Sequence, residues 1–168
     1  MLKLAIIIGS TRPGRNGEGV GKWVYEIAKK RTDAEYELVD LQTFNLPLLD
    51  EPNSPAMQHY TKQHTKEWSE KISSFDGFVF VTPEYNHGVP AALKNAIDYL
   101  YKEWNNKVAG FVGYGVTGGT RSVEHLRLIM AELQIADVRE QVTLSLFTDF
   151  ENYRTFKPAP FHEKKVNA

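Results

Sequence analysis

Short apolar runs alternate along the chain with longer segments of helical periodicity. The run from Leu4 to Ile8 is continuously apolar and ends at a glycine, which is typical of a strand buried on both faces of a sheet. Residues 78–81 form the most hydrophobic run, and we expect a central strand there. The same reasoning predicts strands over residues 36–41, 108–114 and 142–146.

Helices are predicted where apolar residues recur every three to four positions, over residues 17–31, 61–74, 90–104 and 121–134. The segment 90–104 has the clearest apolar face, and Pro90 suits its first turn. Within it, Lys94 and Asp98 are spaced to form an ion pair between successive turns. Residues 42–57 contain three prolines and are predicted to form a loop.

Five strands alternating with four helices predict an α/β fold with a parallel sheet and right-handed crossovers. Helices on both faces make this a doubly wound architecture, and the flavodoxin-like strand order 2-1-3-4-5 fits this number of strands. In such a sheet, ligands bind beyond the carboxyl ends of the strands, at the switch point between strands 1 and 3. We therefore expect function in the loops after Ile8, Val81 and Tyr114.

Composition narrows the function classes. The 168 residues correspond to one domain, with residues 150–168 as a peripheral tail. The 20 Lys and Arg residues almost balance the 21 Asp and Glu residues, and the net charge of −1 argues against nucleic-acid binding. The absence of cysteine excludes phosphatases with a cysteine nucleophile, thiolate metal sites and iron–sulfur clusters.

Targeting and metal-binding signals are also missing from the sequence. No membrane-spanning or targeting segment is evident, so we expect a cytoplasmic protein without a membrane partner. The histidines outside the predicted loops form no metal-ligand pattern, so we expect no metal site. We expect these histidines at the surface: His59, His64, His125 and His162.

The loop after the first strand has the composition of an anion site. Residues 9–17 read Gly-Ser-Thr-Arg-Pro-Gly-Arg-Asn-Gly and lead directly into a predicted helix, whose N-terminus offers unpaired N–H groups and partial positive charge. Ser10 and Thr11 add hydroxyls, and Arg12 and Arg15 add charge-assisted hydrogen bonds. It is not a triphosphate-binding loop, because Arg15 and Asn16 occupy the positions of the required Lys-Ser/Thr pair. A terminal phosphate monoester fits best; the alternative is a solvated turn with two surface arginines.

The two other loops suit a planar ring. Pro83 and Pro90 restrict the ends of the loop at residues 82–90, in which Tyr85, Asn86 and His87 offer groups that stack on a flat ring or hydrogen-bond to it. Glycines in the loop at residues 114–121 free backbone N–H groups to face a ligand edge. Together the three loops match flavin mononucleotide (FMN), with a free nucleoside monophosphate as the alternative.

These loops resemble the NAD(P)H-dependent FMN reductase family, a flavodoxin-like group that includes many azoreductases and quinone reductases. The resemblance covers residues 4–146, and its motifs occur in the family's order and spacing. The matching motifs are Gly-Ser-Thr-Arg-Pro-x-Arg at 9–15, Pro-Glu-Tyr-Asn-x-x-x-Pro-x-x-Leu-Lys-Asn-Ala-Ile-Asp at 83–98, and Tyr-Gly-x-x-Gly-Gly-x-Arg at 114–121.

The resemblance implies FMN as a non-covalent cofactor and distributes the loop residues around it. The phosphate side comprises Ser10, Arg12, Arg15, Asn16 and Gly17, beside the hydroxyl of Thr11. The ring lies along Pro83, Glu84, Tyr85 and Asn86. The other edge of the ring lies near Tyr114, Gly115, Gly118 and Gly119.

The implied activity is an FMN-dependent NAD(P)H oxidoreductase. Hydride passes from the nicotinamide co-substrate to FMN and then to a quinone, azo compound, free flavin or similar small acceptor, in ping-pong order. Hydride transfer itself needs no protein acid or base, and Tyr85 and His87 are the candidates for supplying a proton to the acceptor. Family members usually assemble as homodimers or homotetramers, and exposed side chains of Tyr99, Tyr101 and Trp104 would fit an interface on the helix at 90–104. The alternative for these three aromatic residues is a place in the core of the monomer.

The two alternatives to this activity are an electron carrier and a phosphorelay module. A flavodoxin-like FMN electron carrier that docks protein partners is the alternative, although carriers use a strongly acidic surface and a net charge of −1 provides none. A receiver-type phosphorelay module needs clustered carboxylates at the end of strand 1. The chain has Gly9, Ser10 and Thr11 there, which excludes it.

Overall fold

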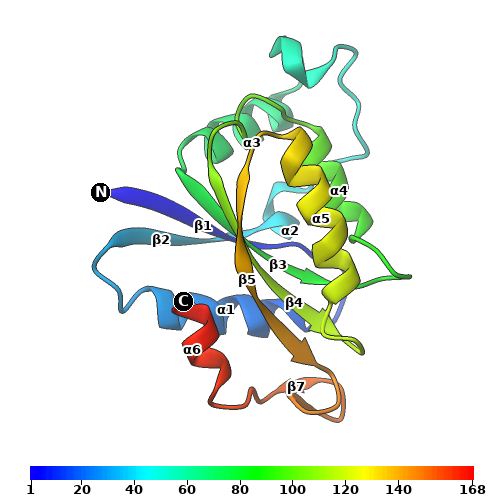
Figure 1. Cartoon of the computed structure of the whole chain (residues 1–168). Helices are drawn as coiled ribbons and strands as arrows, with labels where there is room; N and C mark the ends of the chain where they lie inside the picture. The colour runs from blue at the N-terminus through cyan, green and yellow to red at the C-terminus, as the bar shows by residue number, and fades with distance from the viewer.

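A five-stranded parallel sheet forms the centre of the computed structural model, which describes residues 1–168 (Figure 1). Its strands are β1 (Leu2–Ile8), β2 (Ala34–Asp40), β3 (Gly77–Pro83), β4 (Val108–Gly115) and β5 (Ala136–Ser145). They lie in the order β2-β1-β3-β4-β5, which confirms the predicted flavodoxin-like topology. Pairing places Ile8 beside Val81 and Pro83 beside Tyr114, so β1, β3 and β4 end at the same edge.

Helices cover both faces of the sheet, as predicted (Figure 1). One face packs against α1 (Gly17–Ala28) and the short α6 (His162–Val166); the other packs against α3 (Gln63–Ser73), α4 (Ala91–Asp98) and α5 (Thr120–Glu132). Successive strand residues point to opposite faces, so Ile6 joins the core under α1 while Ile7 joins the core under the other helices. This explains the continuous apolar run in β1.

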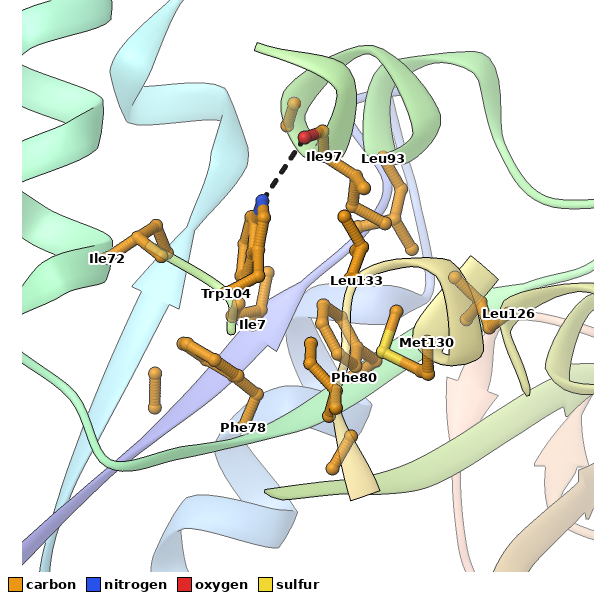
Figure 2. Packing of buried hydrophobic residues seen from close by; sticks show 14 of the residues in the cluster. Ile7, Ile72, Phe78, Phe80, Leu93, Ile97, Trp104, Leu126, Met130 and Leu133 are labelled. Carbon is orange, nitrogen blue, oxygen red and sulfur yellow. Dashed lines mark hydrogen bonds between the residues drawn. The ribbon is translucent and has the colours of Figure 1, made fainter. Parts of the chain in front are cut away.

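The larger of the two cores is rich in aromatic rings (Figure 2). The Trp104 ring packs edge-on against Phe78 with ring centroids 4.9 Å apart, and its Nε1 donates a hydrogen bond to the Ile97 carbonyl oxygen at 3.2 Å. Tyr99 and Trp104 are fully buried here. The expectation that their rings are exposed for an interface is therefore wrong; Tyr101 is partly buried at the edge of the same core.

The helix predicted over residues 90–104 is shorter in the structure. α4 ends at Asp98, and the chain then continues in turns to Asn106. The Glu103 carboxylate accepts the backbone N–H of Tyr101 at 3.2 Å, and the turns still bring Trp104 inward. The apolar spacing therefore continues past the end of the helix. The predicted ion pair is confirmed, with Lys94 Nζ 2.7 Å from Asp98.

Two further boundaries differ from the expectations. The loop predicted at residues 42–57 contains α2 (Leu41–Phe44) and a 3₁₀ turn, η1 (Pro55–Met57). β5 begins at Ala136, six residues before the predicted strand, and its pairing with β4 shifts register between Ala109 and Phe111. The first five residues of β5 are exposed at this sheet edge, so they lack the apolar pattern by which a strand is recognised.

The segment expected as a peripheral tail has structure of its own. It forms a two-stranded hairpin, β6 (Phe150–Glu151) and β7 (Thr155–Phe156), followed by α6, which lies against β5 and α1. The His162 side chain is 5% exposed and its Nε2 lies 3.0 Å from Asp149, so the expectation of a surface histidine is wrong here. No helix of the structure combines the length and apolar character needed to cross a membrane.

Candidate cofactor site

The loops that follow β1, β3 and β4 line a cavity of about 350 Å³ at the carboxyl edge of the sheet. This volume lies within the range of roughly 300–1,000 Å³ that is usual for small-molecule sites. The predicted residues that line it are Arg12, Asn16, Pro83, Glu84, Tyr85, Asn86, His87, Tyr114 and Gly115. Four more residues complete the wall, namely Val116, Thr117, Arg121 and Leu146.

The β1–α1 loop is tied to the β3–α4 loop next to it. The Ser10 side chain is buried, and its Oγ lies 2.7 Å from the Tyr85 hydroxyl, a hydrogen bond in which either group can donate. The Arg12 side chain is exposed, with its guanidinium 5.5 Å from the centroid of the Tyr85 ring. The structure therefore brings the predicted phosphate loop and the predicted ring wall together.

Arg15 does not reach the cavity with its charged end. Its Nη2 lies 2.5 Å from the Asp40 carboxylate, its Nη1 donates to the Ser10 carbonyl oxygen at 2.5 Å, and its side chain is 6% exposed. Asp40, which sequence reasoning missed, is the residue that holds Arg15 in this position. The available signal was an acidic residue ending the strand beside β1, because register places Asp40 opposite Ile8. Thr11 faces a separate cavity of about 280 Å³ that Asn95 also lines.

Two buried polar atoms at this loop have no hydrogen-bond partner, the Tyr114 hydroxyl and Arg15 Nε. Buried polar groups are almost always paired, so the unpaired hydroxyl of Tyr114, which lines the cavity, fits a site that receives an anionic ligand group. Burial raises the pKa of the Tyr114 hydroxyl, which keeps it protonated. The hydroxyl also occupies the space beside Gly17, where a Cβ would lie 2.5 Å from it. A larger residue at the start of α1 would have to displace the Tyr114 side chain.

The β3–α4 loop contains a tight two-residue turn. Backbone hydrogen bonds of 3.1 Å link Tyr85 and Gly88 in both directions, and Asn86 and His87 between them have φ values of 48° and 70°. This left-handed geometry costs a non-glycine residue roughly 1–2 kcal/mol, less for asparagine. The turn holds the exposed Asn86 and His87 at the mouth of the cavity.

An ion pair between Glu84 and Arg121 joins the β3–α4 loop to the β4–α5 loop. Glu84, whose side chain is 6% exposed, accepts hydrogen bonds from Arg121 Nε at 2.5 Å and from the Arg121 backbone N–H at 3.1 Å. Burial acts to raise the pKa of Glu84, but these hydrogen bonds outweigh it, so its pKa lies below the ordinary value. Thr117 adds a hydroxyl to the same carboxylate at 3.2 Å. The Glu84 side chain therefore braces the wall of the cavity.

The glycines of the β4–α5 loop are shaped by the backbone around them. Gly119 has a φ of 68°, and a Cβ there would lie 2.6 Å from the backbone nitrogen of Tyr114. The Gly118 N–H donates to the Gly115 carbonyl oxygen at 3.1 Å, so it is used within the turn. Gly17, Gly118 and Gly119 support the cavity without lining it. No cluster of three or more His, Asp or Glu side chains is arranged to hold a metal ion.

Comparison with known proteins identifies the family. The model of the NADPH-dependent FMN reductase family matches residues 2–149. An NAD(P)H-dependent FMN reductase of Nectria sp is 40% identical over 159 residues, which cover 89% of this chain and 79% of the relative. One from Schizosaccharomyces pombe is 43% identical over 146 residues, covering 84% and 73%. A quinone reductase of Escherichia coli is 32% identical over 140 residues, covering 79% and 71%.

Solved structures agree on the fold. The flavoenzyme NAD(P)H:(acceptor) oxidoreductase of Paracoccus denitrificans superposes with a TM-score of 0.75 at 20% identity, over 99% of this chain and 94% of the other. At that identity the likeness concerns the fold alone. The family model, by contrast, covers the sheet and all three loops of the cavity. The chain therefore belongs to the NADPH-dependent FMN reductase family and is an oxidoreductase of the kind that works with FMN and NAD(P)H.

Proposed function

We propose that the cavity between the β1, β3 and β4 loops binds FMN and that the chain, acting as one FMN-binding domain, transfers electrons from NAD(P)H to small acceptors. The observation that carries this proposal is the unpaired, buried Tyr114 hydroxyl together with the exposed cation Arg12, since both residues line the cavity. A ligand with a terminal phosphate satisfies both groups. Family membership and the relatives named FMN reductase support the same ligand.

The two arginines of the loop then have different tasks. Arg12 has no acidic partner, so its guanidinium is available to the phosphate at the cavity wall. Arg15 uses both terminal nitrogens in hydrogen bonds to Asp40 and the Ser10 carbonyl oxygen, and it does not line the cavity. Arg12 supplies most of the charge, and Arg15 chiefly holds the shape of the loop.

The walls of the cavity receive the ring. When bound, FMN would supply the redox chemistry, the two-electron link between NAD(P)H and the acceptor. Reducing a quinone to its hydroquinone takes up one further proton for each hydride. The Tyr85 hydroxyl lies at the cavity wall and the exposed His87 at its mouth, so either group can deliver that proton. NAD(P)H and the acceptor bind in turn in the cavity between the β1, β3 and β4 loops, and this alternation gives ping-pong kinetics.

Flavin titration tests the binding site. FMN fluorescence should be quenched on binding, and Arg12→Ala should raise the Kd for FMN at least about tenfold, because one charge-assisted hydrogen bond contributes roughly 1.5–3 kcal/mol. The Kd for riboflavin, which lacks the phosphate, should change little. Arg139→Ala is the matched control, since Arg139 is exposed on β5 and does not line the cavity. Equal FMN affinity in Arg12→Ala and in the parent would refute the phosphate role.

Turnover separates the enzyme from the electron carrier. The protein with FMN should oxidise NADPH or NADH in the presence of a quinone, azo dye or free flavin, seen as loss of nicotinamide absorbance. Double-reciprocal plots of the initial rate against NAD(P)H concentration, measured at several acceptor concentrations, should give parallel lines if the order is ping-pong. FMN binding without turnover on any of these acceptors would favour the carrier.

We further propose that the chain forms a homodimer or homotetramer through the face where α4 and α5 lie side by side. Leu128 on α5 is 74% exposed there, next to a shallow groove that Ile97 and Leu133 line. Light scattering should give an even multiple of the chain mass, and Leu128→Glu should lower it. A monomer at micromolar concentration would contradict this assembly.

A further inference from the structure

The C-terminal hairpin lies against the loop proposed to hold the phosphate. Asn16 Nδ2 donates a hydrogen bond to the Tyr153 carbonyl oxygen at 2.8 Å, and Arg154 Nη1 donates to the Gly14 carbonyl oxygen at 2.9 Å. These bonds join residues that are 137 and 140 positions apart in the chain. The contacts with Gly14 and Asn16 lie on both sides of Arg15, so the hairpin spans the second half of the loop.

The hairpin turn adopts a backbone that needs outside support. Asn152 and Tyr153 have φ values of 51° and 59° between the paired strands β6 and β7. The left-handed region is tolerable for asparagine and costly for tyrosine. Such a conformation persists when surrounding contacts hold it in place. Here one of those contacts is the hydrogen bond from Asn16 to the Tyr153 carbonyl oxygen.

The base of the hairpin is anchored on the elements that carry the site. Phe150 is 5% exposed and packs near the ring of Tyr114, with centroids 6.3 Å apart. Phe156 packs against Phe150 at 5.0 Å and edge-on against Trp23 of α1 at 5.5 Å. The hairpin is therefore fixed to β4 and α1, while its tip reaches the loop between β1 and α1.

We propose that residues 150–156 form a strap that holds the phosphate loop in its binding shape, with Arg154 as a positioning residue. Arg15 ties the start of the loop to Ser10, but Arg12, Pro13 and Gly14 are exposed, and the backbone hydrogen bond within this part runs from Arg15 N–H to the Arg12 carbonyl oxygen at 3.1 Å. By donating to the Gly14 carbonyl oxygen, Arg154 restrains the loop without using any of its N–H groups. This inference rests on the proposed FMN function.

The decisive variant is Arg154→Ala, with Lys157→Ala as control. Lys157 is an exposed cation directly after the strap, and its ammonium pairs with Glu151 and not with the loop. Hydrogen exchange of residues 10–17 should become faster in Arg154→Ala and stay at the parent rate in Lys157→Ala. The Kd for FMN should rise about three- to tenfold, the equivalent of one hydrogen bond, while the Kd for riboflavin stays within about twofold. Arg154→Lys should recover part of the affinity, because its ammonium can still donate to Gly14.

Each contrary result has a distinct meaning. Parent-like exchange of residues 10–17 in Arg154→Ala overturns the strap, whatever the flavin titration gives. Faster exchange throughout β1, β3 and β4 also overturns it, because Arg154 would then support the whole fold. An equal loss of FMN and riboflavin affinity overturns the link to the phosphate. A parent protein that binds no FMN refutes the proposed function, and the exchange measurement still decides the strap.

Discussion

Replacing Asp40 with asparagine tests how the phosphate loop is supported. The Asp40 side chain does two things: Oδ2 faces the nearly buried Arg15 guanidinium at 2.5 Å, and Oδ1 accepts the Gln42 N–H at 3.0 Å at the start of α2. Asparagine keeps the size and can keep the helix cap, so Asp40→Asn removes chiefly the negative charge. The variant therefore isolates the ion pair.

The magnitude follows from the burial of the two partners. Charges with centres roughly 4 Å apart attract by about 4 kcal/mol at an effective dielectric constant of about 20. The Asp40 side chain is 25% exposed, against 6% for Arg15, so solvent screens part of this attraction. We expect Asp40→Asn to lower the free energy of unfolding by about 2–3 kcal/mol, because Arg15 keeps its charge without a counterion.

Urea unfolding followed by tryptophan fluorescence measures this change, and Asp33→Asn is the control. Asp33 pairs with Arg31 at the surface, where both side chains are more than a third exposed, so its loss should matter much less. FMN affinity should fall in Asp40→Asn as the loop loosens. Unchanged stability would refute the buried pair, and tighter FMN binding would show that the freed Arg15 is the main phosphate ligand.

Three further variants probe the support of the site. Gly119→Ala should lower the free energy of unfolding, measured in urea, by more than about 3 kcal/mol, because its Cβ would lie 2.6 Å from the Tyr114 backbone nitrogen. Gly19→Ala in α1 is the control: its Cβ would meet no atom closer than 3.7 Å, so the change should be neutral or stabilising. Burial acts to raise the pKa of Asp149, but hydrogen bonds from backbone N–H groups outweigh it and lower the pKa. The stabilisation by Asp149 is therefore fully present above its unfolded-state pKa of about 3.9, and it is lost as pH falls through the lower pKa of the folded state. The midpoint temperature of thermal unfolding should fall as the pH is lowered below about 4. This fall should be smaller in Asp149→Asn, which has no carboxylate to protonate. Glu103→Ala should lower the midpoint of urea unfolding by the equivalent of roughly 2–3 kcal/mol, because the hydroxyls of Ser69 and Tyr60, 2.6 and 2.8 Å from the carboxylate, lose their acceptor. A midpoint equal to that of the parent protein would contradict this role of Glu103.

Local pattern was sufficient for the architecture. The apolar run ending at Ile8 and the alternation of strands and helices predicted the sheet order that the structure confirms. It failed where a local pattern has two structural solutions. The apolar spacing that continues to Trp104 is compatible with a longer helix, and the structure satisfies it with turns after Asp98. The exposed start of β5 carried no apolar pattern at all.

The site divides in the same way. Motif spacing placed the three loops at one edge and named most residues that line the cavity, because the ends of parallel strands are fixed once the strand order is known. Which side chains face the cavity depended on partners from elsewhere in the chain. Asp40 pairs with the charged end of Arg15, which does not line the cavity, and Arg121 pairs with the carboxylate of Glu84.

The sequence by itself determined the class of fold, the edge of the sheet at which the cavity lies and the family, since periodicity and short motifs are properties of neighbouring residues. Tertiary structure decided which cation is free, which is neutralised, and that the C-terminal hairpin reaches the phosphate loop. These outcomes depend on contacts such as Arg154 with Gly14, across 140 positions. A local pattern carries no trace of such a contact, because the two groups become neighbours only after the sheet and α1 have packed.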